Sequence, residues 1–279
     1  MNAIQIYSKL SAQRSQYLST AREASRLTLP YLIRNEDTYN KSSEVLITPW
    51  QSVGAKGVVT LASKLMLALL PPQTSFFKLQ VNDGKVPTTE LNPAIRSELD
   101  LSFAKVERTI MESIAASDDR VIVHQALKHL VVSGNALLFM SKEGLKLYPL
   151  NRYVVDRDGS GNVITIVTKE TVSKKLVKKF FPEYKEPEPN EVSAGGGLSD
   201  AYTGDVGDDE CDVYTHVYRE NNKYCWHQEI DGKEIPGTSG KAQQDVNPWL
   251  VLRFNHVDGE SYGRGRVEEF LGDLKSLEA

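Results

Sequence analysis

The sequence predicts an α+β fold in which N-terminal helices pack with an antiparallel β meander and a β hairpin. Three observations support this prediction. Apolar residues recur at helical spacing through residues 1–135, short β-type runs separated by turn residues fill residues 136–255, and an amphipathic helical stripe occupies the end of the chain. Helices and strands that are segregated along a chain are typical of α+β folds, whereas regular alternation predicts a parallel sheet.

The first two helices differ in their apolar patterns. The first carries a single apolar face and ends before Pro30. The second is expected between Thr48, a candidate N-cap followed by Pro49, and the Pro71-Pro72 pair. Because this second helix is apolar on most sides, we expect it to be buried and central, with Gly54 and Gly57 allowing another element to approach closely. The apolar face of the first helix consists of Ala3, Tyr7, Leu10, Tyr17, Ala21 and Ala24.

The next two helices are separated by a short break. A stripe from Ile95 to Ile114 predicts the third helix, whose other faces are charged and solvated. Ser117 and Asp118 are candidate N-caps for the fourth helix, which should end at Gly134-Asn135.

From Ala136 the pattern becomes that of strands. The runs "ALLFM", "LKLYPL", "YVVDR" and "NVITIVT" predict an antiparallel meander, followed by a short lysine-rich helix within residues 169–185. Residues 183–210 are rich in Asp, Glu and Gly and almost free of basic residues, which predicts a mobile, acidic surface loop.

The following segment predicts a hairpin with Asn221-Asn222 as its turn. This register places His216 opposite His227, with Cys225 or Glu229 nearby, which resembles part of a metal site. A structural zinc ion prefers four ligands, so we interpret this face as the exposed polar side of a half-buried hairpin. We predict no metal or cofactor. His124 and His129 on the fourth helix also lack the spacing of a metalloprotease motif.

The stretch Gly259-Glu260-Ser261-Tyr262-Gly263 matches the G-x-S-x-G nucleophile elbow of serine hydrolases. In that fold the acid and the histidine of the triad follow the serine, but no histidine follows Ser261 here. We therefore predict no catalytic residue. Instead, Ser261 should cap the final helix, with Gly263 and Gly265 permitting close packing at its start. The chain also lacks the G-K-[ST] sequence of a P-loop.

Composition limits the remaining possibilities. The chain has 279 residues and a net charge of −4, which argues against tight binding of nucleic acid through its whole surface. Cys211 and Cys225, without a signal peptide, predict free thiols in a reducing compartment. The longest apolar run, Leu65 to Leu70, is far shorter than the ~20 residues that span a bilayer, so we expect a soluble protein.

The final helix, residues 263–279, has no stop signal, which predicts that the sequence is a fragment.

A series of sequence blocks follows a fixed order along the chain: "TPWQSVGAKG", "TLASKLMLALLP", "ALKHLVVSGNALLF", "YPLNRYVVDRDGSGNV", "DVYTHVY" and "DGESYGRGRVEEFLGDLKSLE". Together they resemble the head-to-tail connector, or portal, proteins of short-tailed double-stranded DNA bacteriophages. The resemblance runs from about Leu18 to Ala279 and is weakest within residues 183–210.

The resemblance implies a structural subunit without enzymatic activity. Portal proteins form a ring, twelvefold in the mature virion, at one vertex of the capsid, and DNA enters and leaves through its channel. Residues 1–262 would be the wing, and residues 263–279 would begin the stem helix. Expected partners are further copies of the chain, the terminase large subunit, tail adaptor proteins, and capsid and scaffolding proteins. The implied location is the portal vertex of the virion, after assembly in the host cytoplasm.

A portal role also makes physical sense of the charge pattern. Ring closure needs two complementary patches, for which the mixed-charge third helix and the lysine-rich segment 169–185 are candidates. A slightly acidic wall would keep passing DNA mobile. The basic run formed by Lys174, Lys175, Lys178 and Lys179 is interpreted as a solvated face or a counter-charge to the acidic loop, with a DNA or partner contact as the alternative. Two other functions stay open: a serine hydrolase, and a generic DNA- or partner-binding module.

Overall fold

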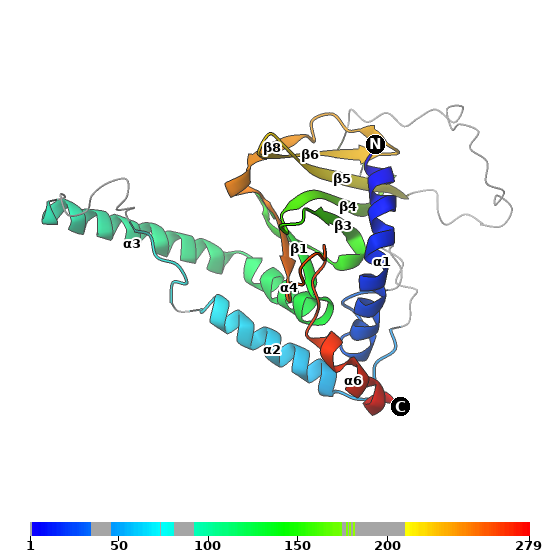
Figure 1. The fold of residues 1–279 in the computed structure, drawn as a ribbon. Coiled ribbons are helices and arrows are strands. Elements are labelled where there is room, and N and C mark those ends of the chain that lie inside the picture. The colour runs from blue at the N-terminus through cyan, green and yellow to red at the C-terminus, as the bar shows by residue number, and fades with distance from the viewer. Residues whose placement is uncertain are drawn as a thin grey trace.

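The computed structural model describes residues 2–34, 46–72, 74–80, 92–174, 177, 179, 181 and 210–279. The predicted acidic loop, residues 183–210, lies outside these residues except for Glu210. The described chain forms a body with two antiparallel sheets and an arm of two helices, of which one packs along the edge of the body and the other projects from it (Figure 1). The α+β fold class is therefore confirmed.

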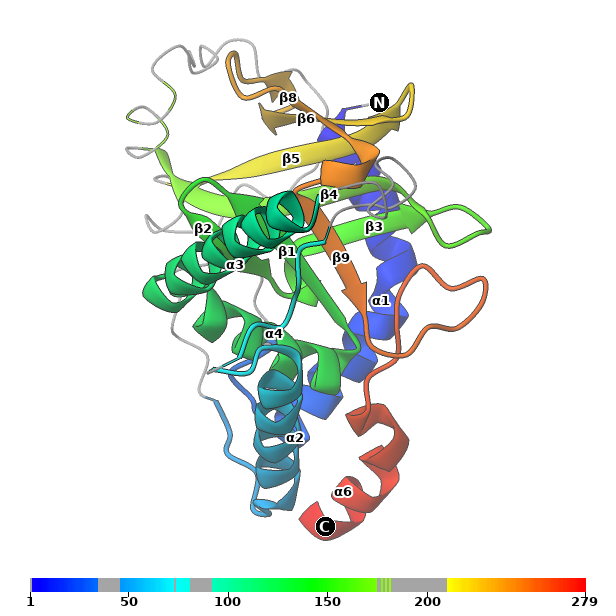
Figure 2. The ribbon, with the colours of Figure 1, turned by 90° about the vertical axis from the view of Figure 1, so that its left-hand side faces the viewer.

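Helix α1 (Ala3–Leu27) runs along the body from the hairpin strands to the C-terminal end of the chain (Figures 1 and 2). The Asn2 side chain caps it by accepting a hydrogen bond from the backbone N–H of Gln5. Its buried face includes most of the predicted apolar positions and also Arg14. The Nη1 atom of Arg14 donates to the backbone oxygens of Leu150 (3.0 Å) and Tyr153 (2.7 Å), which joins α1 to the sheets.

The strands are antiparallel, as predicted, but the runs of the predicted meander are divided between two sheets. Strand β1 (Asn135–Ser141) lies between β2 (Gly144–Tyr148) and β9 (Trp249–Arg253). After β2, the 3₁₀ helix η2 (Leu150–Arg152) turns the chain away and buries Leu150, so β2 does not pair with the next strand. The second sheet has the order β3 (Tyr153–Arg157), β4 (Val163–Ser173), β5 (Glu210–Glu220), β6 (Lys223–Ile230) and β7 (Lys233–Glu234), and β8 (Gly240–Gln243) also pairs with β6.

The hairpin of β5 and β6 has the predicted register. Asn221 and Asn222 both adopt positive φ angles, 47° and 63°, as a two-residue type I′ turn requires. His216 consequently lies opposite His227. The predicted lysine-rich helix is wrong for residues 169–173, because Lys169 to Ser173 extend β4 and pair with β5.

The remaining helices are α2 (Val53–Leu69), α3 (Pro93–Ala116) and α4 (Asp119–Ser133). Helix α2 begins after Ser52 rather than after Thr48, because the Gln51 side chain accepts a hydrogen bond from the backbone N–H of Gly54 at 2.9 Å. Helix α4 ends at Gly134, whose φ of 74° gives the left-handed conformation expected there. None of the helices in the described ranges combines the length and apolar character needed to cross a membrane.

The main core lies between α1, α4 and the two sheets. Its largest fully buried side chains include Tyr153, Tyr262, Leu27, Leu137, Leu150 and Ile166. The chain ends in a 3₁₀ turn, η4 (Val267–Phe270), and a short helix, α6 (Leu271–Glu278). The final helix therefore begins later than Gly263, and Ser261 does not cap it.

Candidate assembly interface

The arm helices expose apolar side chains that have no cover within the described chain. On α2, the buried residues are Val58 and Ala62, whereas Leu67 is 60% exposed. The prediction that α2 is buried on most sides is therefore wrong. Its core-facing side packs on α4 through Ala62, and the other sides face outward. The exposed apolar residues of α2 are Val53, Val59, Leu67 and Leu69.

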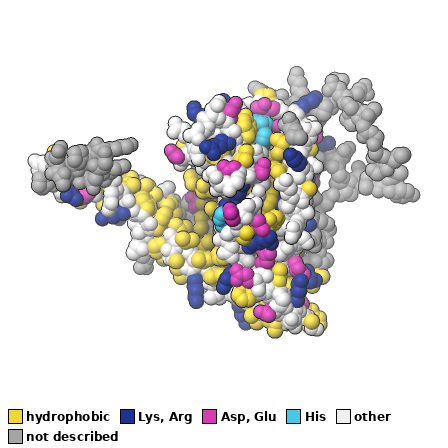
Figure 3. All heavy atoms as spheres, viewed as in Figure 1, with side chains coloured by type: hydrophobic (Ala, Val, Ile, Leu, Met, Phe, Trp, Pro, Cys, Tyr) yellow, Lys and Arg dark blue, Asp and Glu magenta, His cyan; other side chains and the backbone are white. Residues whose placement is uncertain are grey.

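Helix α3 extends this apolar surface away from the body. Leu101 is 62% exposed, and no described residue of α3 is buried. The exposed apolar residues of this helix are Ile95, Leu101, Val106 and Ile110. Hydrophobic side chains gather along the arm and at its junction with the body (Figure 3). Exposed apolar surface of this extent is typical of a protein–protein contact, and we refer to these residues of α2 and α3 as the apolar arm.

An apolar groove of about 400 Å³ lies at the base of the arm, between α2 and the C-terminal segment. Val53, Gly57 and Leu61 line one wall, and Phe270, Leu274 and Leu277 line the other. Phe270 and Leu277 are themselves exposed. The groove therefore continues the apolar arm onto the chain's last helix.

The segment before η4 is held tightly against the end of α4. Asn135 forms two hydrogen bonds with Gly263: its Nδ2 donates to the Gly263 carbonyl at 2.8 Å, and its Oδ1 accepts from the Gly263 N–H at 2.7 Å. A side chain at Gly265 would collide with the backbone of Val132. The predicted close packing at these glycines is thus confirmed, but the neighbour is α4 and the segment is not yet helical.

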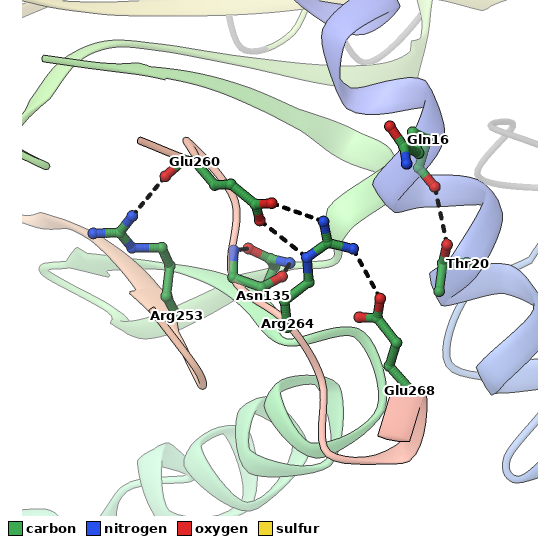
Figure 4. A network of polar contacts seen from close by, with 8 residues as sticks. Gln16, Thr20, Asn135, Arg253, Glu260, Arg264 and Glu268 are labelled. Atoms are coloured by element: carbon green, nitrogen blue, oxygen red, sulfur yellow. Dashed lines mark hydrogen bonds and ion pairs between the residues drawn. The ribbon is translucent and has the colours of Figure 1, made fainter. Parts of the chain in front are cut away.

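Arg264 links this segment to its surroundings through charged contacts (Figure 4). Its guanidinium donates to both carboxylate oxygens of Glu260, at 2.9 and 2.8 Å, and to Glu268 at 2.8 Å. It also lies over the ring of Tyr17 on α1, 4.8 Å from the ring centroid. The hydrogen bonds from Arg264 lower the pKa of Glu260. This network fixes one wall of the groove relative to the body.

The G-x-S-x-G stretch has a structural role in this arrangement. Tyr262 is buried, and its hydroxyl oxygen accepts a hydrogen bond from the Val155 N–H at 3.1 Å. The Ser261 carbonyl accepts from Arg157 Nε at 3.0 Å. Within the described residues, no hydrogen bond joins the Ser261 hydroxyl to a histidine, so the geometry gives no support to a hydrolase triad.

Four of the five histidines fall into two groups, one on α4 and one on the hairpin. On α4, burial lowers the pKa of His129 to about 4, and His124 Nε2 lies 3.4 Å from Ser63 Oγ. On the hairpin, His216 and His227 come together with Glu229. The interpretation of that face as exposed is wrong, because the N-terminal end of α1 packs on it and leaves Glu229 only 6% exposed.

Some charged residues of the surfaces predicted to form ring contacts already form ion pairs within the chain. Lys169 pairs with Asp212 of the neighbouring strand at 2.9 Å, and Arg108 pairs with Glu112 within α3. Cys211 and Cys225 form no disulfide, as predicted. Sequence reasoning missed the apolar arm as a surface, although the unusual apolar circumference of α2 was its signal.

Comparison with known proteins gives a consistent result. The family model for bacteriophage head to tail connecting proteins matches residues 1–279. The chain is 37% identical to the portal protein of Escherichia phage T7, over 98% of this chain and 49% of that protein. It is 38% identical to the portal protein of Enterobacteria phage T3, again over 98% and 49% of the two chains. The portal protein of Enterobacteria phage SP6 is 30% identical, over 96% of this chain and 50% of its own length. The chain thus spans about half the length of these relatives.

Proposed function

Because this chain belongs to the bacteriophage head-to-tail connecting protein family, we propose that it forms part of a portal ring at one vertex of a phage capsid. Double-stranded DNA would pass through the axial channel of this ring during packaging and ejection. The chain's role would be structural, without catalysis. The terminase large subunit, tail adaptor proteins, and capsid and scaffolding proteins would be its partners in assembly and in the virion.

Within this proposal, residues 1–262 form the wing of the subunit, and residues 263–279 lead into the stem. The modest negative charge of the chain, −4, would disfavour tight binding of the passing duplex. Because tight DNA binding needs many cations against phosphates, such a wall would guide DNA without holding it.

The observation that carries the proposal is the apolar arm. A closed ring is built by head-to-tail contacts in which one patch of each subunit meets a different patch of its neighbour. Leu67 on α2 and Leu101 on the projecting helix α3 are each more than half exposed (Figure 1). Burial of such side chains against a neighbouring subunit would supply roughly 1.5–3 kcal/mol each. We therefore assign the apolar arm to one of the two ring contacts.

The test is assembly of the full-length protein, measured by particle mass and negative-stain electron microscopy. We expect closed annular particles for the natural sequence. Leu67→Asp and Ile110→Asp should shift the protein to monomers, because each places a charge in an apolar contact.

Arg108→Ala, which lies on the side of α3 opposite Val106 and Ile110, is the matched control and should leave the rings intact. The proposal fails if the natural protein forms no rings. The assignment of the contact to the apolar arm fails if both aspartate variants still assemble, or if the control disrupts assembly as strongly as they do.

A further inference from the structure

The hairpin of β5 and β6 brings together three side chains with the chemistry of metal ligands. His216 and His227 are a directly opposed cross-strand pair, and Glu229 lies two residues further along the same face of β6. The two imidazole ring centroids are 5.3 Å apart. One potential ligand atom from each of the three residues lies within 4.8 Å of the other two.

Glu229 is held in place by the first turn of α1. Its Oε2 accepts a hydrogen bond from the Ala3 N–H at 2.7 Å, and its Oε1 lies 2.9 Å from His227 Nε2. The carboxylate is almost fully buried, so its position is fixed by the packing of α1 on the sheet. A carboxylate beside a metal-binding histidine is commonly oriented by a backbone donor of this kind.

His216 completes the group from the neighbouring strand β5. Its ring lies beside the rings of Tyr218 and His227, and within the described part of the chain neither of its nitrogens has a hydrogen-bond partner. His216 is half-buried, and one of its ring nitrogens belongs to the set of ligand atoms that lie within 4.8 Å of one another. An imidazole nitrogen that carries no proton offers a lone pair to a metal ion.

We propose that His216, His227 and Glu229 bind a transition-metal ion of the Zn²⁺ class. Two imidazoles and a carboxylate suit zinc, whereas Mg²⁺ and Ca²⁺ prefer oxygen ligands alone. Zinc-ligand bonds of about 2.0–2.2 Å place tetrahedral ligand atoms roughly 3.3 Å apart, so small side-chain rotations bring these atoms onto one ion. A water molecule would complete the four ligands.

The ion would join the two hairpin strands and, through Glu229, the start of α1. It would stabilise the end of the body opposite the groove between α2 and α6 (Figures 1 and 2). The inference does not depend on ring formation, because none of its ligands belongs to the apolar arm.

The test uses the 279-residue chain, first freed of metal with a chelator and then equilibrated with a small excess of Zn²⁺. After removal of unbound ion, elemental analysis should find one zinc per chain, and the melting temperature should rise in proportion to the logarithm of zinc concentration. Replacement by Co²⁺ should give the visible absorption of a tetrahedral site. His216→Ala should lower the zinc affinity roughly tenfold or more without unfolding the chain, since this side chain makes no hydrogen bond in the described structure.

Glu229→Gln is the second variant, because the amide oxygen can still accept from Ala3 while providing a poorer ligand. His256→Ala, at an exposed position on another loop, is the matched control and should bind zinc like the natural chain. The proposal is overturned if the natural chain retains no zinc, or if His216→Ala and Glu229→Gln bind it as tightly as the control. Circular dichroism of each variant separates loss of the site from loss of the fold.

Discussion

The body and the arm both contain apolar segments, but the body buries their side chains whereas the arm leaves many of them exposed. In the body, Leu137 and Leu150 are completely buried between the helices and the sheets. In the arm, Leu67 and Leu101 remain mostly exposed, although α2 has the most apolar sequence among the described helices. A helix that is apolar on most sides is therefore expected to be covered, but its sequence does not indicate whether the covering residues belong to the same chain or to another.

Charged side chains also differ in burial between the body and the arm. In the body, Arg14 is buried and donates to the backbone oxygens of Leu150 and Tyr153. In the arm, Arg108 and Glu112 form an exposed pair on the surface of α3. The body thus pairs part of this buried guanidinium internally, although Arg14 Nε and the Tyr153 hydroxyl have no hydrogen-bond partner among the described residues. The arm has the composition of a surface that is completed by another molecule.

The largest expected difference between the two regions concerns truncation of leucine side chains. Leu137→Ala should lower the free energy of unfolding of the 279-residue chain by about 2–5 kcal/mol, because it leaves a cavity in the core. Leu67→Ala should change it by less than about 0.5 kcal/mol, because the side chain is already solvated. Urea denaturation at low protein concentration measures both. Equal losses would mean that α2 is covered within the chain, which would remove the contrast between body and arm.

A smaller effect distinguishes the two sides of α2 itself. A Cβ atom at Gly54 would lie 2.9 Å from the Leu27 carbonyl oxygen, so Gly54→Ala should destabilise the chain by about 1–3 kcal/mol. A Cβ atom at Gly57 would meet open space among the described residues. Gly57→Ala should therefore stabilise the chain by about 0.5–1 kcal/mol through its helix propensity.

Thermal unfolding of both glycine variants gives the comparison, and each serves as the control for the other. Loss of stability in Gly57→Ala would show that the outer side of α2 is packed. If Gly57→Ala stabilises the chain but weakens rings of the full-length protein, the neighbouring subunit approaches α2 at this glycine.

Local signals in the sequence were sufficient for several parts of the fold. The two asparagines at positions 221 and 222 fixed the hairpin register, because a type I′ turn leaves only one pairing of the flanking strands. Gly134 marked the end of α4 for a similar reason, since its positive φ angle favours glycine. The same register places His216 opposite His227.

Features that depend on distant contacts could not be read from local patterns. Strand β1 pairs with β9, which lies far along the chain, and Leu137 lies opposite Val251. The start of the final helix was misplaced because Gly263 is bound to Asn135 at the end of α4 rather than continuing into a helix. The burial of Glu229 depends on α1, which covers a face that the hairpin sequence alone predicts to be exposed.

The smallest expected effect tests the charged network that joins the body to the groove. Glu260→Gln removes the ion pair with Arg264 and should cost about 1 kcal/mol at neutral pH, as is typical of a partly exposed, well-aligned pair. Arg264 lowers the pKa of Glu260 below its usual value of 4.5 in the folded chain. The contribution of the carboxylate is therefore fully present above pH 4.5 and is lost as the pH falls through the lower, folded-state pKa.

The unfolding free energies of the natural chain and of Glu260→Gln should consequently converge as the pH is lowered below 4.5. Glu112→Gln provides the control, because its exposed partner Arg108 lies on the arm and contributes at most about 0.5 kcal/mol. A difference for Glu260→Gln that persists unchanged in acid would mean that the side chain acts through packing rather than charge. The C-terminal wall of the groove would then be held by Asn135 and the close contact at Gly265, with the ion pairs contributing little.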